Sequence, residues 1–264
     1  MTLERFDTGA PHPARRYNYW LGGEDNFAAD RESGDLLAKS YPAARIAARA
    51  NRAFLGRAVS YLAAEAGIRQ FLDIGTGLPT AGNTHEVAQR IAPDSRIVYV
   101  DNDPMVMAHA RALLTSTPEG ATRYLEDDLR NPEKILAETA ILDFAEPVGL
   151  ILVAVAHFLP SQEEAVSIVR TLLGALPAGS HLVMSCATTD FLTPQLTANW
   201  DESLRTGRSD VYPRTRAEFD EFFAGLKVVA PGVVAVSEWR PEPQATEKAT
   251  PLEASIFGAV GRKI

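Results

Sequence analysis

The sequence predicts an α/β fold: a mostly parallel sheet of seven strands, with helices on both faces and an antiparallel pair of strands at its C-terminal end. The first observation is that short hydrophobic runs alternate with amphipathic helical segments between residues 69 and 187. The second is that these runs are apolar at consecutive positions, as in "VGLILVAV". Strands that are buried on both faces have this pattern, and strands that alternate with helices pair in parallel.

Each element follows from the same pattern. Five strands are expected at residues 69–75, 96–103, 122–129, 148–159 and 179–187. The helices between them are expected at residues 84–92, 104–114, 131–142 and 161–176. Pro104 suits the first turn of the second helix, and Ser161 with Glu164 forms a capping box for the fourth. After an insertion with a helix near 196–204, the sequence predicts a helix at 216–226 and two strands at 228–239 and 253–263.

The segment before the first strand has a helical pattern. Residues 42–66 are rich in Ala and Arg, and their apolar side chains recur at helical spacing. Gly67 is a suitable helix stop. We therefore expect two parts: an N-terminal helical lid or cap at residues 1–66, and one compact domain at residues 67–264.

Composition and charge exclude several classes of function. The net charge of -8 argues against a nucleic-acid-binding protein, whereas a cationic ligand would suit an acidic pocket. Cys186 is the only cysteine, which fits a reducing compartment, and we expect the cytoplasm. The N-terminal residues lack the apolar core of a signal peptide, and the apolar run at 148–159 is too short to span a bilayer. We expect no membrane association, and the oligomeric state stays open.

The stretch "FLDIGTGLPT" predicts a nucleotide site of the Rossmann-like type. Asp73 ends a strand, and Gly75 and Gly77 follow, where glycine lets the backbone turn tightly and approach a ligand. Asp101 ends the next strand and is placed to hold two ribose hydroxyls. A dinucleotide fold prefers a third glycine, but Thr80 stands at that position. Asp73 would be poorly placed beside a pyrophosphate and would suit a ligand with an ammonium group, such as S-adenosylmethionine.

These motifs resemble those of a known family. The spacing is similar to that of the class I S-adenosylmethionine-dependent methyltransferases at Asp73, Gly75, Gly77, Asp101, Asp127 and Asp128. The stretches "RYNYWLGGEDNFAADR", "HEVAQ", "DNDP", "LVAVAHFLP" and "PGVV…WRP" resemble an actinobacterial S-adenosyl methyltransferase family, long known as a domain of unknown function. The resemblance runs from about residue 16 to the end of the chain. It implies methyl transfer from S-adenosylmethionine to a small-molecule acceptor, with S-adenosylhomocysteine as product, in bacterial secondary metabolism.

The resemblance also implies roles for single residues. The glycine loop and Asp73 would contact the methionine end of the cofactor, and Asp101 its ribose. Asn102 would lie beside the adenine, and Leu129 would meet the adenine edge through its backbone N–H. The carboxylate at that edge comes from Asp128, or from Asp127 if the register differs by one. The expected cofactor-binding residues are Asp73, Gly75, Thr76, Gly77, Asp101, Asn102, Asp127, Asp128, Leu129 and Ala154. No metal is expected.

The acceptor side is predicted from two segments. His157 follows the fourth strand and would face the reacting end of the cofactor, although a structural role for a buried histidine explains it equally well. The segment before the first strand commonly lies across the cofactor in this fold, and Tyr17 is a second catalytic candidate. The expected lid and substrate residues are Tyr17, Tyr19, Trp20, Gly22, Gly23, Asp25, Asn26 and His157, with Phe27 as a further aromatic wall.

Two other functions compete with methyl transfer. An NAD(P)-dependent oxidoreductase shares the sheet and the first glycines, but Pro79 and Thr80 occupy the place where its motif needs a third glycine. A regulatory protein that binds S-adenosylmethionine without catalysis would keep Asp73 and Asp101 and lack a working acceptor pocket.

Overall fold

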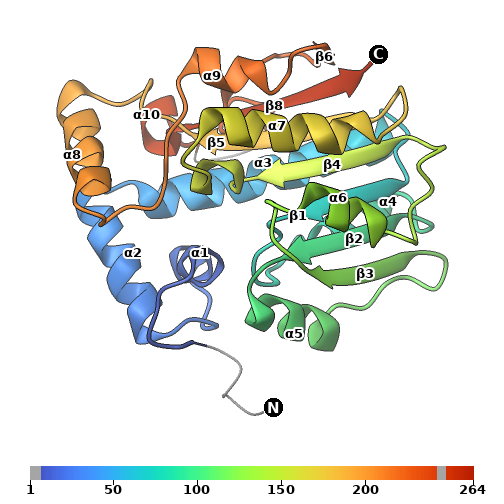
Figure 1. Cartoon of the computed structure of the whole chain (residues 1–264), viewed down its shortest axis with the longest axis horizontal. Helices are drawn as coiled ribbons and strands as arrows, with labels where there is room; N and C mark the ends of the chain where they lie inside the picture. Colours follow the sequence, from blue (N-terminus) through green and yellow to red (C-terminus); the bar gives the residue numbers. More distant parts are fainter. Residues whose placement is uncertain (1–6, 243–247) are drawn as a thin grey trace.

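The computed structural model describes residues 7–242 and 248–264, and its centre is a single mixed sheet. The strand order is β3-β2-β1-β4-β5-β8-β6, and β7 also pairs with β8 (Figure 1). The five strands from β3 to β5 run parallel, whereas β8 is antiparallel to β5, β6 and β7. The strands are β1 (Gln70–Ile74), β2 (Arg96–Asp101), β3 (Ala121–Glu126), β4 (Val148–Val153), β5 (His181–Ala187), β6 (Leu226–Val228), β7 (Val234–Ala235) and β8 (Ile256–Lys263).

Helices cover both faces of this sheet and one of its ends. They are α1 (Pro13–Leu21), α2 (Ala28–Ser40), α3 (Ala44–Ala64), α4 (Thr84–Ile91), α5 (Pro104–Leu113), α6 (Pro132–Ala137), α7 (Gln162–Gly174), α8 (Pro194–Arg205), α9 (Arg216–Glu221) and α10 (Pro251–Ala254), with a 3₁₀ turn at Ala156–Phe158. The starts at Pro104 and Ser161 are as predicted: Pro104 opens α5, and the Ser161 hydroxyl accepts a hydrogen bond from the N–H of Glu164.

Successive residues of each central strand point to opposite faces and build two cores. Leu72 of β1 and Val98 of β2 pack with α6, α7 and α9 on one face. Phe71 and Ile97, one residue earlier in each strand, pack with α3 and α4 on the other. Because both faces are buried, these strands need apolar side chains at consecutive positions. The predicted α/β class with a mostly parallel sheet and antiparallel C-terminal strands is therefore confirmed.

The C-terminal strands differ from the prediction in one respect. In place of one strand at 228–239, the chain forms β6, which begins earlier and ends at Val228, and the short β7 at Val234–Ala235. Within the described residues the sheet therefore has eight strands rather than seven. The chain between β6 and β7 turns at Pro231 and Gly232, where the N–H of Gly232 donates to the carbonyl of Val229. Proline has no N–H for a ladder and Gly232 has a positive φ of 97°, so this stretch turns instead of continuing the strand.

The N-terminal helices lie at the end of the sheet to which the parallel strands point. In Figure 1, α1, α2 and α8 gather beyond the tips of these strands. Helix α3 links the two regions, because it contacts α1 and α10 at that end and also packs on α4 and the sheet. Residues 7–66 therefore contain two helices that cover the strand ends, and a third that covers a face of the sheet.

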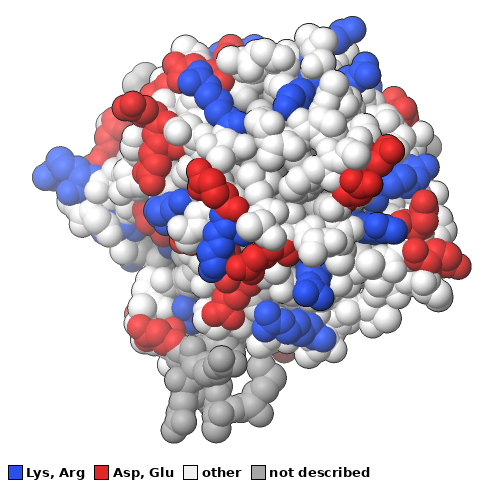
Figure 2. Space-filling model, turned by 45° about the vertical axis from the view of Figure 1, so that its right-hand side comes forward, with Lys and Arg blue, Asp and Glu red and all other residues white. Residues whose placement is uncertain are grey.

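The surface carries both signs of charge. Figure 2 shows Lys and Arg interspersed with Asp and Glu on the face that it presents. Dispersed charge of this kind favours solubility over recognition of a polyanion. Within residues 7–242 and 248–264, no helix combines the length and apolar character needed to cross a bilayer.

Candidate active site

A cavity of about 450 Å³ lies between the ends of the parallel strands and helices α1, α2, α3 and α8. This volume is typical of sites for small molecules and cofactors. The sequence-predicted residues that line it are Tyr17, Trp20, Asp73, Gly75, Thr76, Gly77, Asp101, Asn102, Asp127, Asp128, Leu129, Ala154 and His157. The predicted residues that do not line it are Tyr19, Gly22, Gly23, Asp25, Asn26 and Phe27.

The two glycines of the first loop are needed for different reasons. Both have positive φ, 75° at Gly75 and 68° at Gly77, a region that residues with a Cβ rarely adopt. A Cβ on Gly75 would lie 2.4 Å from Cγ2 of Val155, so the loop after β4 can approach only a glycine. A Cβ on Gly77 would meet nothing within 4 Å. Gly77 lines the cavity, and its N–H donates to Oδ2 of Asp101 at 2.8 Å.

Asp73 and Asp101 place two buried carboxyl groups beside this loop. Burial raises the pKa of Asp73 to about 6, against a partial lowering by the hydrogen bond from the Thr84 hydroxyl. Burial also raises the pKa of Asp101, although the N–H groups of Asp103 and Gly77 donate to its carboxylate. Two acids held in a desolvated cavity favour a ligand with positive charge or hydroxyl donors.

The acids after β3 have separate surroundings. Asp128 accepts a hydrogen bond from Nδ2 of Asn102 at 2.8 Å, which joins the ends of β2 and β3. Asp127 instead pairs with Nζ of Lys134 at 2.7 Å and accepts from Nδ2 of Asn131. Burial alone would raise the pKa of Asp127, but these bonds lower it overall. The carboxylate of Asp127 is thus committed to the start of α6, whereas Asp128 bridges to Asn102 and pairs with Arg130 at 3.2 Å.

His157 is a neutral hydrogen-bond donor in this site. Its Nδ1 accepts the backbone N–H of Ala187 at 3.2 Å, which assigns the proton to Nε2. Burial, with smaller effects from neighbouring arginines, lowers the pKa of His157 to about 3. With Nδ1 occupied and Nε2 protonated, the ring has no free lone pair to accept a proton from a ligand.

Tyr17 belongs to a chain of hydrogen bonds under the cavity. Its hydroxyl donates to the carbonyl of Ala48 at 2.9 Å and accepts from Nδ2 of Asn51 at 3.1 Å. Oδ1 of Asn51 accepts from the hydroxyl of Ser185, which in turn accepts the N–H of Ala154. Ala154 has a φ of 57°, a strained value for a residue with a Cβ. These hydrogen bonds fix α1 and α3 to the loop after β4. Burial raises the pKa of Tyr17.

The remaining residues of the N-terminal motif build the cap itself. Tyr17 and Trp20 are three residues apart and share the inner face of α1, whereas the hydroxyl of Tyr19 donates to Asp35. A Cβ on Gly23 would lie 2.3 Å from Nδ2 of Asn18, which explains the glycine by packing. Asn26 donates to Oδ1 of Asn18 and to the carbonyl of Gly23. Asp25 lies 3.6 Å from His109 of α5.

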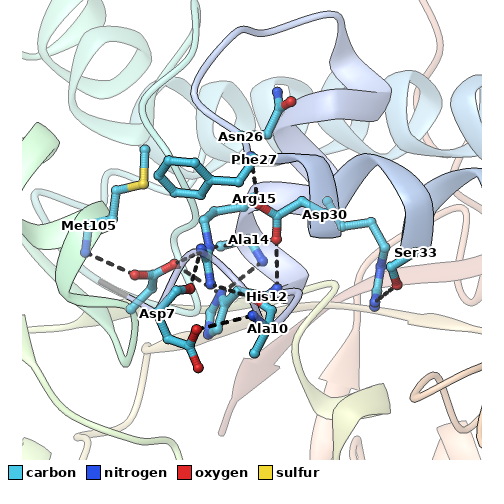
Figure 3. A network of polar contacts seen from close by, with 12 residues as sticks. Asp7, Ala10, His12, Ala14, Arg15, Asn26, Phe27, Asp30, Ser33 and Met105 are labelled. Carbon is cyan, nitrogen blue, oxygen red and sulfur yellow. Dashed lines mark hydrogen bonds and ion pairs between the residues drawn. The ribbon is translucent and has the colours of Figure 1, made fainter. Parts of the chain in front are cut away.

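A network of polar contacts docks the cap on α5, next to the end of β2 (Figure 3). Nε of Arg15 lies 3.2 Å from Asp103, and Nδ1 of His12 lies 3.2 Å from the same carboxylate. Asp30 is fully buried and accepts the N–H groups of His12 and Phe27, each at 2.8 Å. The ring of Phe27 packs beside Met105. Asp103 is two residues from Asp101, so the contacts that dock the cap lie next to the buried acid at the end of β2.

Sequence reasoning missed several residues of the cavity. Arg52 of α3 donates to the carbonyl of Thr80 and to Oδ1 of Asn83, and so holds the glycine loop from the cap side. Arg16 lines the opposite part with Tyr41, Trp200 and Asp210. Arg16 was predicted only as the start of a motif, and Tyr41 and Trp200 lie in segments without a recognisable motif. Asp210 lies in the arginine-rich stretch at 205–216, which the sequence favours as a solvated loop over a site for an anionic substrate. Their shared place depends on tertiary contacts of α2 and α8.

The fold, the glycine loop and the ordered acids agree with a match to one family over the full length. The S-adenosyl methyltransferase family profile matches residues 1–264. The chain belongs to the S-adenosyl methyltransferase family. A search of curated proteins finds no match.

Solved structures of this S-adenosyl methyltransferase's relatives support the same assignment. A DUF574 family protein from Streptomyces avermitilis is 46% identical over 98% of this chain and 99% of that chain, with a TM-score of 0.91. A Thermobifida fusca protein, described as a candidate methyltransferase, is 40% identical over 96% and 95%, with a TM-score of 0.85. An O-methyltransferase family protein from Burkholderia thailandensis, 17% identical over 88% and 62% with a TM-score of 0.53, shares the fold.

The cavity of this S-adenosyl methyltransferase fits its cofactor. The acidic half, with buried Asp73 and Asp101, suits the ammonium group and the ribose hydroxyls of S-adenosylmethionine. When bound, that cofactor supplies a methyl group already activated on a sulfonium. The open space beside Gly77 leaves room for a ligand against the backbone. The protein is therefore an S-adenosylmethionine-dependent methyltransferase, and its site residues contribute binding, alignment and exclusion of water.

Proposed function

We propose that the chain transfers the methyl group to a small-molecule acceptor bound under the cap. One observation carries the proposal: the acids at the strand ends and the side chains of α1, α2 and α8 line a single cavity. A cofactor at the strand ends and an acceptor under the helices would thus meet in one space. The cap function falls within residues 1–66, mainly on α1 and α2, and residues 67–264 bind the cofactor.

The proposed cofactor contacts follow the order of the strands. Asp73 and the glycine loop, with Thr76, bind the methionine end, and Arg52 is placed to neutralise its carboxylate. Asp101 binds the ribose. Asn102, Asp128 and Leu129 surround the adenine, whereas Asp127 supports the loop through Lys134. Ala154 contributes backbone beside the reacting end. His157 donates a hydrogen bond to the acceptor, and Tyr17 positions α1.

The kind of partner, the cellular compartment and the origin of the protein are also proposed. Dispersed charge and an enclosed site support a small molecule, and neither a nucleic acid nor a membrane surface. The single cysteine, Cys186, is buried, and burial raises its pKa to about 12, so the thiol is inert and fits the cytoplasm. Relatives from Streptomyces and Thermobifida support an actinobacterial origin. A role in secondary metabolism stays a prediction from the family resemblance.

Calorimetric titration with S-adenosylmethionine, S-adenosylhomocysteine and NAD tests the cofactor contacts. We expect the two sulfur compounds to bind and NAD not to bind. Asp101→Ala should weaken both by about tenfold or more, because it removes hydrogen bonds to a charged acceptor. Asp201→Ala, an exposed acid of α8, is the control and should bind as the wild type does. Binding of NAD alone would support the oxidoreductase alternative and contradict the proposed site.

A further inference from the structure

The half of the cavity away from the acids has a different character. We call it the acceptor chamber, and it is lined by Arg16, Trp20, Tyr41, His157, Trp200 and Asp210. The rings of Tyr41 and Trp200 lie 5.6 Å apart at 46°, and the guanidinium of Arg16 lies 5.7 Å from the ring centre of Trp20. Aromatic walls of this kind favour a planar ring, because stacked and edge-on contacts add to the burial of apolar surface.

The two charged side chains of the acceptor chamber differ in burial. The side chain of Arg16 is 4% exposed, whereas that of its ion-pair partner Asp210 is 47% exposed. A buried guanidinium requires a counter-charge, but a carboxylate at the surface can return to water at little cost. Arg16 also donates to the hydroxyl of Ser33, and its Nε has no hydrogen-bond partner. The cation is therefore the fixed member of the pair, and Asp210 is the exchangeable one.

The backbone around Asp210 is held independently of this pair. Nε1 of Trp200 donates to the carbonyl of Val211, and the N–H of Tyr212 donates to the carbonyl of His157. A rotation of the Asp210 side chain alone can thus release Arg16 while the loop stays in place. Behind the chamber, Arg214 is held by backbone carbonyls, and within the described residues no carboxylate pairs with it. His157 adds a further donor, its Nε2–H.

We propose that the methyl acceptor is a planar aromatic molecule that binds as an anion, with its negative group replacing Asp210 on Arg16. The proposal rests on the proposed function, because it concerns the acceptor of that methyl transfer. The two halves of the cavity then have opposite preferences: buried acids for the cationic cofactor, and a buried guanidinium for the acceptor.

Two probes with the same ring and opposite charge test this preference: naphthoate and naphthylmethylammonium, titrated calorimetrically onto protein saturated with S-adenosylhomocysteine. We expect naphthoate to bind about tenfold more tightly than the ammonium compound, as a charged hydrogen bond in a desolvated site requires. Arg16→Gln should remove this difference. Asp210→Asn should tighten naphthoate binding by roughly threefold to tenfold, since the competing carboxylate is gone.

The two variants separate recognition from structural damage. A loosened chamber would weaken naphthoate in both variants, whereas the proposal expects opposite directions. Asp210 is half exposed, so its variant is expected to fold even if Arg16→Gln does not. Arg205→Gln, which removes an exposed arginine of α8, is the control and should not change naphthoate binding.

Three results would overturn the proposal: equal affinity for the two probes, binding of neither, or weaker naphthoate binding to Asp210→Asn. If the protein still binds S-adenosylhomocysteine with normal affinity, each of these results rejects only the proposed class of acceptor. Failure of the wild-type protein to bind S-adenosylhomocysteine would instead reject the proposed site as a whole.

Discussion

At the scale of one residue, the Asp73 carboxylate is expected to bind the cofactor and to lower the stability of the folded protein. The folded protein raises its pKa from 3.8 to about 6, mainly by burial, so folding favours the protonated acid. The stability that this group contributes is present below pH 3.8 and is lost as the pH rises through about 6. Asp73→Asn should therefore raise the free energy of unfolding at pH 8 by about 1–3 kcal/mol and weaken cofactor binding. Urea denaturation without ligand measures the first effect.

The pH dependence distinguishes this cause from a local packing change. The increase in the free energy of unfolding caused by Asp73→Asn should shrink as the pH falls below about 6, because the wild-type acid then becomes neutral too. Asp201→Asn, at an exposed position on α8, should change stability little at either pH. A loss of stability in Asp73→Asn at pH 8 would contradict the assigned cost of burying this carboxylate.

His157 gives a second prediction at this scale. With a pKa near 3 and Nδ1 occupied by the N–H of Ala187, the ring should stay neutral and protonated on Nε2 between about pH 5 and pH 8. Nitrogen-15 NMR of the histidine rings measures both properties, and the His157→Asn spectrum assigns the signal. A titration of this ring near pH 6.5 would restore His157 as a candidate general base.

The loop between β1 and α4 acts as an element, because its shape depends on glycine. Gly75→Ala places a Cβ 2.4 Å from Val155 and forces a φ of 75° on alanine. We expect the variant to lose about 1–3 kcal/mol of stability and most of its affinity for S-adenosylhomocysteine. Thermal denaturation and calorimetric titration measure the two effects.

Gly56 provides the matched control for that substitution. It lies in α3, and an added Cβ would meet nothing within 4 Å. Gly56→Ala should therefore stabilise the protein by about 0.5–1 kcal/mol through helix propensity, with unchanged ligand binding. The double variant Gly75→Ala/Val155→Gly removes both close contacts, to Cγ2 of Val155 at 2.4 Å and to its Cβ at 2.6 Å, and keeps the backbone strain of a positive φ at position 75. If it behaved like wild type, the steric contact alone would explain the glycine.

Across the whole molecule, the sequence predicted the features that depend on a local motif. It did not predict the part of the site that distant segments assemble. The parallel strands could be predicted because burial on both faces demands continuous apolar runs. Asp73, Asp101 and the glycines could be placed because each stands at or just after the carboxyl end of a predicted strand. Arg16 and Asp210 are separated by 194 residues, and no local pattern links them.

The N-terminal motif shows a second limit of prediction. Its residues are dense in the sequence, but α1 turns only one face to the cavity, so that Tyr17 and Trp20 line it and Tyr19 does not. Helical periodicity could have made this distinction for α1. It could not have done so for Gly23 and Asn26, whose packing on Asn18 depends on the turn after the helix.

The attachment of the cap is a property of the whole molecule and can be loosened at one buried residue. Asp30→Ala removes the acceptor of the His12 and Phe27 N–H groups and a nearby counter-charge of Arg15, which lies 3.7 Å away. We expect faster hydrogen exchange in α1 and α2 with little change in β1, β4 and β5, and a stability loss of about 3 kcal/mol. Glu32→Ala, an exposed change on the same helix, should leave exchange in α1 near the wild-type rate. S-adenosylhomocysteine should bind more weakly to Asp30→Ala, since the docked cap closes the cavity beside Asp101. Equal acceleration of exchange in the sheet and the cap would mean that the cap and the sheet unfold as one unit, and that the ion pairs on α5 are not a separate attachment.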